Sequence, residues 1–191
     1  MFDQTRLSSV GKRYASLDKL RRQLQAASAE ILSGSKRSGF ATQRGDHKAA
    51  AKEIAIALTH IKAAKKLIKT ESRLANEGMW RAALEEYAEG KMYHDAMSIG
   101  KVGHIPELPE DPDLYIGALS DLTGELTRSA VLAATERNSK EVRRLLEAVR
   151  DAIAFMLTLN LTGTMRTKFD QAKGNLRKLE EIAFTLSVNE R

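Results

Sequence analysis

Apolar residues recur along this chain at intervals of three and four, the spacing typical of amphipathic helices. The first predicted helix begins between Gly11 and Ser16 and reaches at least Leu32, and a second runs from an N-cap at Asp46 to about Lys69. The pattern then predicts four more helices: Met79–Ile99, a segment that contains Tyr115–Arg128 and ends near Thr135, Asn138–Leu157, and Thr164–Leu186. No segment shows the alternation of a strand. The sequence therefore predicts an all-α fold, with about six or seven long helices packed in a layered bundle.

Glycine and proline divide these helical segments. The stretch "SGSKRSG" (Ser33–Gly39) contains two glycines and by itself predicts a break, and Leu74–Gly78 predicts a short connection. The clearest loop is Gly100–Asp113, which holds all three prolines. No repeat or linker divides the chain further, so we expect residues 1–191 to form a single helical domain.

Composition narrows the classes of protein. The chain has no cysteine, which excludes disulfides and thiolate zinc sites. No apolar run is long enough to span a membrane, and the first residues lack the apolar core of a secretory signal, so we expect a cytoplasmic protein without a membrane partner. Residues 1–69 carry 15 Lys and Arg against 5 Asp and Glu, whereas residues 70–191 carry 16 against 20. The basic first third indicates a polyanion such as nucleic acid, and ordinary solvated helix faces remain the alternative.

Two predicted helices carry paired carboxylates inside otherwise apolar stripes. Glu86 shares its face with alanines and Tyr93, and Glu89 follows one turn later. Asp121 and Glu125 repeat this arrangement on the next long helix. If the two helices pack side by side, four carboxylates meet, and they cannot all remain ionised in a low-dielectric site without a cation.

Such an oxygen-only cluster suits Mg²⁺ or Mn²⁺, ions that support phosphodiester hydrolysis. The alternative is that these acids lie on a solvated face or form ion pairs, for example between Glu125 and Arg128. A di-iron bundle is excluded because it requires Glu-x-x-His motifs, and Met92 and Arg128 stand where the histidines would be. The four histidines are scattered over different predicted elements and indicate no site.

The same residues carry a family resemblance. "LYIGALSDLTGELTR" (114–128) resembles the signature D-Y-x-x-G-x-x-D-L-T-G-E-L-M-R of the TRAX (translin-associated factor X) branch of the translin family, and "LEEYAEG" (84–90) is similar to its L-Q-E-Y-V-E-A. "AEILSGSKRSGFATQR" (29–44) and "KLEEIAFTLSV" (178–188) are similar to the first and last family motifs. The matches span nearly the whole chain in the family's order. The short loop 100–113 replaces a long eukaryotic segment, so the chain looks more like archaeal members.

The resemblance implies a seven-helix fold, a continuous first helix through residues 33–39, and a hollow homo-oligomer, an octamer, that encloses RNA. It also implies a metal-dependent endoribonuclease with Glu86, Glu89, Asp121 and Glu125 as the catalytic, metal-binding acids. One of them, with Glu89 as a candidate, would be the general base. The alternative within the family is a translin-like scaffold that binds RNA or DNA without cleaving it. An assembly protein with no nucleic-acid role is a third hypothesis, which the basic first third disfavours.

Basic residues near these motifs are candidates for binding the backbone phosphates of RNA, or of single-stranded DNA. They are Lys36, Arg37 and Arg44 on the first helix, and Arg81, which follows Trp80 as the arginine does in translin's H-W-R segment. Contacts of this kind to phosphates give little sequence preference and strong salt dependence. Solubility is the alternative explanation for each of these charges.

Overall fold

The computed structural model describes residues 1–189, and all regular structure within them is helical. The described residues form six α-helices and one short 3₁₀ helix, which confirms the predicted all-α class. In chain order they are α1 (Gln4–Gln43), α2 (His47–Thr70), η1 (Ser72–Asn76), α3 (Gly78–Ser98), α4 (Pro112–Thr135), α5 (Ser139–Leu157) and α6 (Gly163–Asn189).

The first helix differs from the apolar pattern in two ways. It begins at Gln4 because the side chain of Asp3 caps it, accepting hydrogen bonds from the backbone N–H groups of Thr5 and Arg6. It also continues through residues 33–39, so the break predicted from the two glycines is wrong and the continuity implied by the family resemblance is confirmed. Gly34 is buried where α1 packs on α2: a Cβ added there would lie 3.4 Å from the Cβ of Ala57, an ordinary contact distance. This packing against α2 accompanies the continuous helix through residues 33–39.

Polar caps define where later helices begin. The side chain of Asp46 accepts a hydrogen bond from the backbone N–H of Ala49 at 2.9 Å, which confirms the predicted start of α2. Asp111 accepts from Leu114 N–H at the start of α4. These short polar side chains satisfy N–H groups that a helix cannot pair internally.

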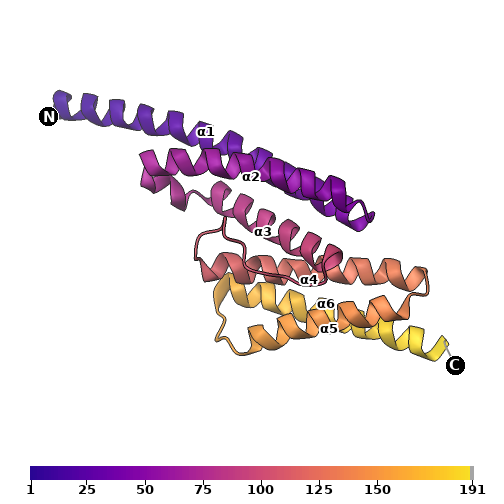
Figure 1. Cartoon of the computed structure of the whole chain (residues 1–191). Coiled ribbons are helices and arrows are strands. Elements are labelled where there is room, and N and C mark those ends of the chain that lie inside the picture. Colours follow the sequence, from indigo (N-terminus) through magenta and orange to yellow (C-terminus); the bar gives the residue numbers. More distant parts are fainter. Residues whose placement is uncertain (190–191) are drawn as a thin grey trace.

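The helices form two groups joined by α3. Figure 1 shows α1 and α2 side by side as an antiparallel pair, α4, α5 and α6 packed together, and α3 between the groups. Consistent with this central place, α3 is buried on more than one side: Leu84, Tyr87, Met92 and Tyr93 are all almost fully buried. The N-terminal part of α1 extends beyond α2, and residues 1–16 are exposed.

The helices α3 and α4 run in the same direction. The segment between them, residues 99–111, crosses back along the bundle before α4 begins (Figure 1). Contacts follow a rising register: Arg81 on α3 pairs with Asp111 at the start of α4 at 2.7 Å, and the Tyr93 hydroxyl lies 2.6 Å from Ser129 Oγ. The parallel register therefore places the acid-bearing turns of the two helices at the same level of the bundle.

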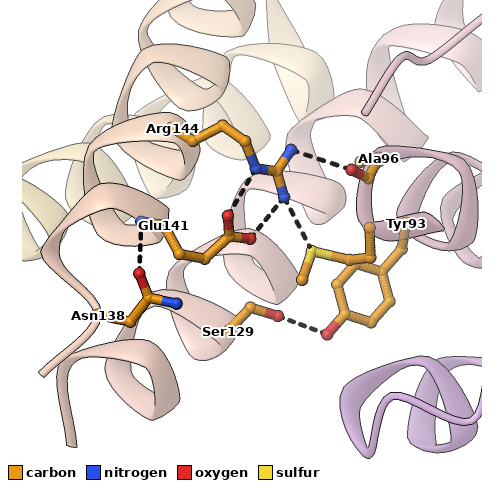
Figure 2. Close-up of polar contacts among 7 residues, drawn as sticks. Tyr93, Ala96, Ser129, Asn138, Glu141 and Arg144 are labelled. Carbon is orange, nitrogen blue, oxygen red and sulfur yellow. Dashed lines mark hydrogen bonds and ion pairs between the residues drawn. The ribbon is translucent and has the colours of Figure 1, made fainter. Parts of the chain in front are cut away.

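A second contact fastens the end of α3 to α5. Arg144 on α5 donates to the carbonyl oxygen of Ala96 at 3.0 Å and pairs with Glu141 on its own helix at 2.6 Å. Figure 2 shows this guanidinium beside the Tyr93–Ser129 hydrogen bond, with Asn138 capping α5 below it. Together these contacts hold the C-terminal half of α3 against α4 and α5.

Candidate functional site

The acids predicted from the sequence surround a cavity of about 230 Å³ formed by α1, α3 and α4. Three of the four line it directly: Glu86 and Glu89 from α3, and Glu125 from α4. The remaining wall is given by Ser35, Lys36, Gly39 and Phe40 of α1, Gly90 and Tyr93 of α3, and Arg128 of α4. The structure therefore brings together residues that are up to 93 positions apart in the sequence, from Ser35 to Arg128.

Close packing between α1 and α3 shapes one wall of this cavity. A Cβ at Gly90 would lie 3.3 Å from the carbonyl oxygen of Ser35, so any larger residue would force the two helices apart. Gly90 follows Glu89 directly, and the close approach holds the Glu86–Glu89 turn against the turn of α1 that carries Ser35 and Lys36.

Asp121, the fourth predicted acid, lies beside the cavity and is held by a lysine from α6. Lys168 Nζ lies 2.5 Å from Asp121 Oδ2 and also 2.5 Å from Glu85 Oε1. The Lys168 side chain is only 19% exposed. Burial alone would lower the pKa of this ammonium, but the hydrogen bonds to Asp121 and Glu85 outweigh it and raise the pKa, so Lys168 stays charged.

Lys168 and Glu85 were not found by sequence reasoning. Glu85 stands beside Glu86 in "LEEYAE", but helical spacing placed it outside the face considered. Its carboxylate reaches Lys168 by crossing Gly117, where an added Cβ would lie 2.6 Å from Glu85 Oε1. Lys168 is 47 residues from Asp121 and carries no local signal, so only the packing of α6 on α4 reveals it.

Carboxylate crowding changes the acid strengths in the site. Burial first, and then the carboxylates of Glu86, Asp121 and Glu125, raise the pKa of Glu89 to about 8, while Lys168 opposes them. The pKa of Glu86 is also raised, first by burial, with Lys36 opposing and the neighbouring acids reinforcing the shift. Burial and neighbouring carboxylates thus both favour the protonated forms of Glu86 and Glu89.

The donor set fits a hard divalent cation by its chemistry. All the side chains are carboxylates, and an added positive charge would offset the carboxylate repulsion that, after burial, raises the pKa of Glu89. Within residues 1–189, however, no three His, Asp or Glu side chains are already grouped so that they could hold a metal ion. Mg²⁺ keeps several waters and needs only one or two protein carboxylates, so it does not require such a closed cage.

The four basic residues predicted to bind nucleic acid lie in different environments. Lys36 is exposed and lines the cavity. Arg37 pairs with Glu53 of α2 at 2.8 Å, and Arg81 pairs with Asp111 at 2.7 Å, away from the cavity walls. Arg44, just after α1, is exposed and makes no ion pair with any residue that the structure describes. The structure therefore gathers Lys36, but not Arg81, with the acids.

Two of the histidines come together elsewhere. His47 and His94 pack edge to face with ring centroids 5.9 Å apart, and one ring nitrogen of His94 contacts Asp95 Oδ1 at 3.3 Å. Because His47 and His94 lie far apart in the sequence, no local pattern predicted their contact. Neither histidine lines the acidic cavity.

The fold and the cavity define a class of protein: an all-helical domain that presents a carboxylate-lined site between parallel helices. The sequence profile described as "Translin family" matches residues 13–190, and the chain belongs to this family. Among curated proteins, none matches the sequence significantly.

Solved structures share the fold over nearly the full chain. "Crystal structure of apo-NeC3PO" superposes with a TM-score of 0.85 at 19% identity, covering 97% of this chain and 98% of that chain. "Structure of AfC3PO - duplex RNA complex" gives a TM-score of 0.85 at 20% identity, covering 96% and 97%. "Crystal structure of AfC3PO" gives 0.82 at 22% identity, covering 96% and 98%. At these identities the likeness establishes the fold.

The length and apolar character of the helices decide whether any of them could span a membrane. In the described part of the chain, no helix combines the length and apolar character that a membrane span requires.

Proposed function

We propose that this protein is a metal-dependent endoribonuclease that hydrolyses phosphodiester bonds of single-stranded RNA. The observation that carries the proposal is the convergence of Glu86, Glu89 and Glu125 on one cavity, with Asp121 beside them. These are the acids that the TRAX-like motifs nominate. Mg²⁺ or Mn²⁺ held by them would polarise the phosphate and supply activated water.

Charge explains why a cation is central to this proposal. A cavity lined by three carboxylates repels an RNA phosphate, and a bound cation would offset that repulsion. Lys36 from α1 and Arg128 from α4 also line the cavity and supply part of that positive charge. Glu89, with a pKa raised to about 8, holds its proton at neutral pH in the metal-free chain. It is our candidate for the general base once a bound cation has displaced that proton.

RNA as the ligand class also agrees with a structural relative. The AfC3PO structure described as a duplex RNA complex shares this fold. The basic first third of the chain, with exposed Lys36 and Arg44, offers phosphate contacts without base recognition.

We extend the proposal to assembly as a hollow homo-oligomer, an octamer, that surrounds the RNA. Leu7, Val10 and Tyr14 form an exposed apolar stripe on the part of α1 that extends beyond α2. Such a stripe gains stability when a second copy covers it. The size of the oligomer rests on the family resemblance alone.

A second candidate function is a scaffold that binds RNA or DNA without catalysis. The observation in its favour is that two acids already have cationic partners: Asp121 contacts Lys168, and Glu125 contacts Arg128 at 3.2 Å. In this function the acids would be structural.

One experiment separates the two functions. Labelled single-stranded RNA is incubated with the wild-type chain and with Glu89→Gln, Glu86→Gln and Asp121→Asn, in Mg²⁺, in Mn²⁺ and in chelator. Glu147→Gln is the matched control, because Glu147 is an exposed α5 carboxylate outside the cavity. Cleavage by the wild type and the control alone, abolished by chelator, supports the nuclease. Binding without cleavage under either ion favours the scaffold, and cleavage that survives in the variants or in chelator points to a contaminant.

A further inference from the structure

Phe40 is a large apolar side chain left exposed at the rim of the acidic cavity. Its side chain lines the cavity from α1, yet the residue remains 56% exposed. Exposing an apolar ring to water is unfavourable, although a single exposed phenylalanine would need no explanation on an ordinary surface. Phe40, however, lines the same cavity as Glu86 and Glu89, so an RNA bound at these acids could contact its ring.

Phe40 lies between two cations in the sequence, Lys36 on α1 and Arg44 at its C-terminal cap. Lys36 precedes Phe40 by four residues, so the two project from the same side of the helix, about 6 Å apart along its axis. Arg44, the C-cap residue, follows Phe40 by four positions at the end of the helix. Lys36 and Arg44 are both exposed. An aromatic ring flanked by basic side chains is the arrangement by which proteins bind single-stranded nucleic acid: the cations follow the phosphates and a base stacks on the ring.

The other aromatic side chain in the cavity wall cannot take this role. Tyr93 is fully buried, and its hydroxyl is hydrogen-bonded to Ser129 Oγ at 2.6 Å (Figure 2). Of the side chains that line the cavity, Phe40 is therefore the one with a ring face available to a ligand.

We infer that Phe40 forms a base-stacking subsite, which holds one unpaired nucleobase of the RNA next to the phosphate positioned over Glu86, Glu89 and Glu125. The inference rests on the proposed function and deepens it by defining the substrate. Bases inside a duplex have both faces covered by their neighbours, so this subsite selects single-stranded segments. It is indifferent to base identity, because every base presents a flat π face.

The test is a double-mutant cycle between the protein and the RNA. A single abasic nucleotide is moved stepwise along a short single-stranded RNA, and each strand is assayed with wild-type, Phe40→Ala, Phe40→Leu and Phe40→Trp chains. Binding is measured by fluorescence anisotropy in chelator, and cleavage is measured in Mg²⁺. Phe184→Ala is the matched control, since Phe184 is an exposed phenylalanine on α6 that does not line the cavity.

Stacking predicts that Phe40→Ala and Phe40→Leu weaken binding of the intact strand about tenfold, whereas Phe40→Trp and Phe184→Ala bind it like the wild type. When the abasic nucleotide lies at the stacked position, the wild type should bind the strand more weakly by the same factor. Phe40→Ala should bind that strand as tightly as it binds the intact one. Two results would overturn the inference. The first is that Phe40→Ala binds the intact strand as tightly as the wild type does. The second is that Phe40→Ala binds every abasic strand more weakly than the wild type by the same factor, which would mean that Phe40 acts on folding or assembly. Because binding is measured without metal, stacking can be confirmed or rejected even if the protein does not cleave RNA. If the protein cleaves RNA but the Phe40 substitution and the abasic position show no coupling, the stacking inference is rejected and the proposed nuclease function is retained.

Discussion

Lys168 on α6 places its ammonium 2.5 Å from a carboxylate oxygen of Asp121 on α4, and the same ammonium reaches Glu85 on α3. One cation thus joins three helices beside the acidic cavity. Its charge opposes the effect of burial and of the neighbouring carboxylates, which together raise the pKa of Glu89. Whether Asp121 is free to bind a metal ion depends on this contact.

Replacing Lys168 with methionine should destabilise the metal-free protein. The change leaves Asp121 and Glu85 as crowded, unpaired carboxylates, and we expect a loss of roughly 1–3 kcal/mol in the free energy of unfolding, below the full cost for a deeply buried pair. Urea unfolding in chelator measures it. Lys168→Arg should retain most of the stability, and Lys178→Met, at an exposed position of the same helix, should stay within about 0.5 kcal/mol of the wild type.

Divalent ions give this prediction a second readout. Mn²⁺ should recover more stability in Lys168→Met than in the wild type, because the ion no longer competes with an ammonium for Asp121. Equal stability of Lys168→Met and wild type in chelator would contradict the role assigned to the lysine.

Glu89 should make the metal-free protein less stable as the pH rises. Its pKa in the folded chain is about 8, against 4.5 for an ordinary glutamate, so the folded state holds a proton that the unfolded state releases. The stabilisation is complete below about pH 4.5 and is lost as the pH rises through about 8. Glu89→Gln should lack this loss and exceed the wild type at pH 9 by on the order of a few kcal/mol, at about 1.4 kcal/mol per pKa unit.

Denaturant titrations between pH 4 and pH 9 in chelator would test this difference. Glu147→Gln should follow the wild-type profile, since Glu147 lies on the exposed face of α5. Parallel profiles for Glu89→Gln and wild type would mean that Glu89 is ionised normally in the folded protein.

Gly90 should be needed for the close contact between α1 and α3. Gly90→Ala would put a Cβ 3.3 Å from the Ser35 carbonyl oxygen, a backbone atom that cannot rotate away, and we expect a loss of roughly 1–3 kcal/mol. Gly174→Ala is the contrasting variant, because a Cβ added there would have nothing within 4 Å and alanine favours a helix by up to about 1 kcal/mol. Thermal unfolding of both should shift the midpoint in opposite directions; a stabilised Gly90→Ala would refute the packing argument.

Salt dependence should distinguish the predicted phosphate contacts. Removing a cation that touches a phosphate lowers the slope of log K against log salt by about 0.7 for a single strand. We expect this change for Lys36→Ala and Arg44→Ala, which are exposed, and a smaller one for Arg81→Ala, whose guanidinium is already paired with Asp111 at 2.7 Å. RNA titrations at several salt concentrations measure the slopes. Equal changes for all three would show that the Arg81 ion pair opens for RNA.

Local patterns in the sequence were sufficient to predict the helices. Apolar spacing and polar caps such as Asp46 predicted helix type and most boundaries, because both act within a few residues. The start of α1 was missed because residues 4–16 have no buried face to create a pattern. The Ser33–Gly39 break was predicted wrongly because the packing of this segment on α2, with Gly34 against Ala57, is a tertiary contact that the local pattern does not show.

The sequence by itself also nominated Glu86, Glu89, Asp121 and Glu125, since carboxylates in apolar stripes conflict with the cost of burying charge. Only the tertiary structure decided how they meet. The parallel register of α3 and α4 brings Glu86, Glu89 and Glu125 to one cavity, whereas Lys168 draws Asp121 toward α6. Helical spacing determines which side chains share a face of one helix, but the partner of that face depends on contacts between distant segments, which no local pattern encodes.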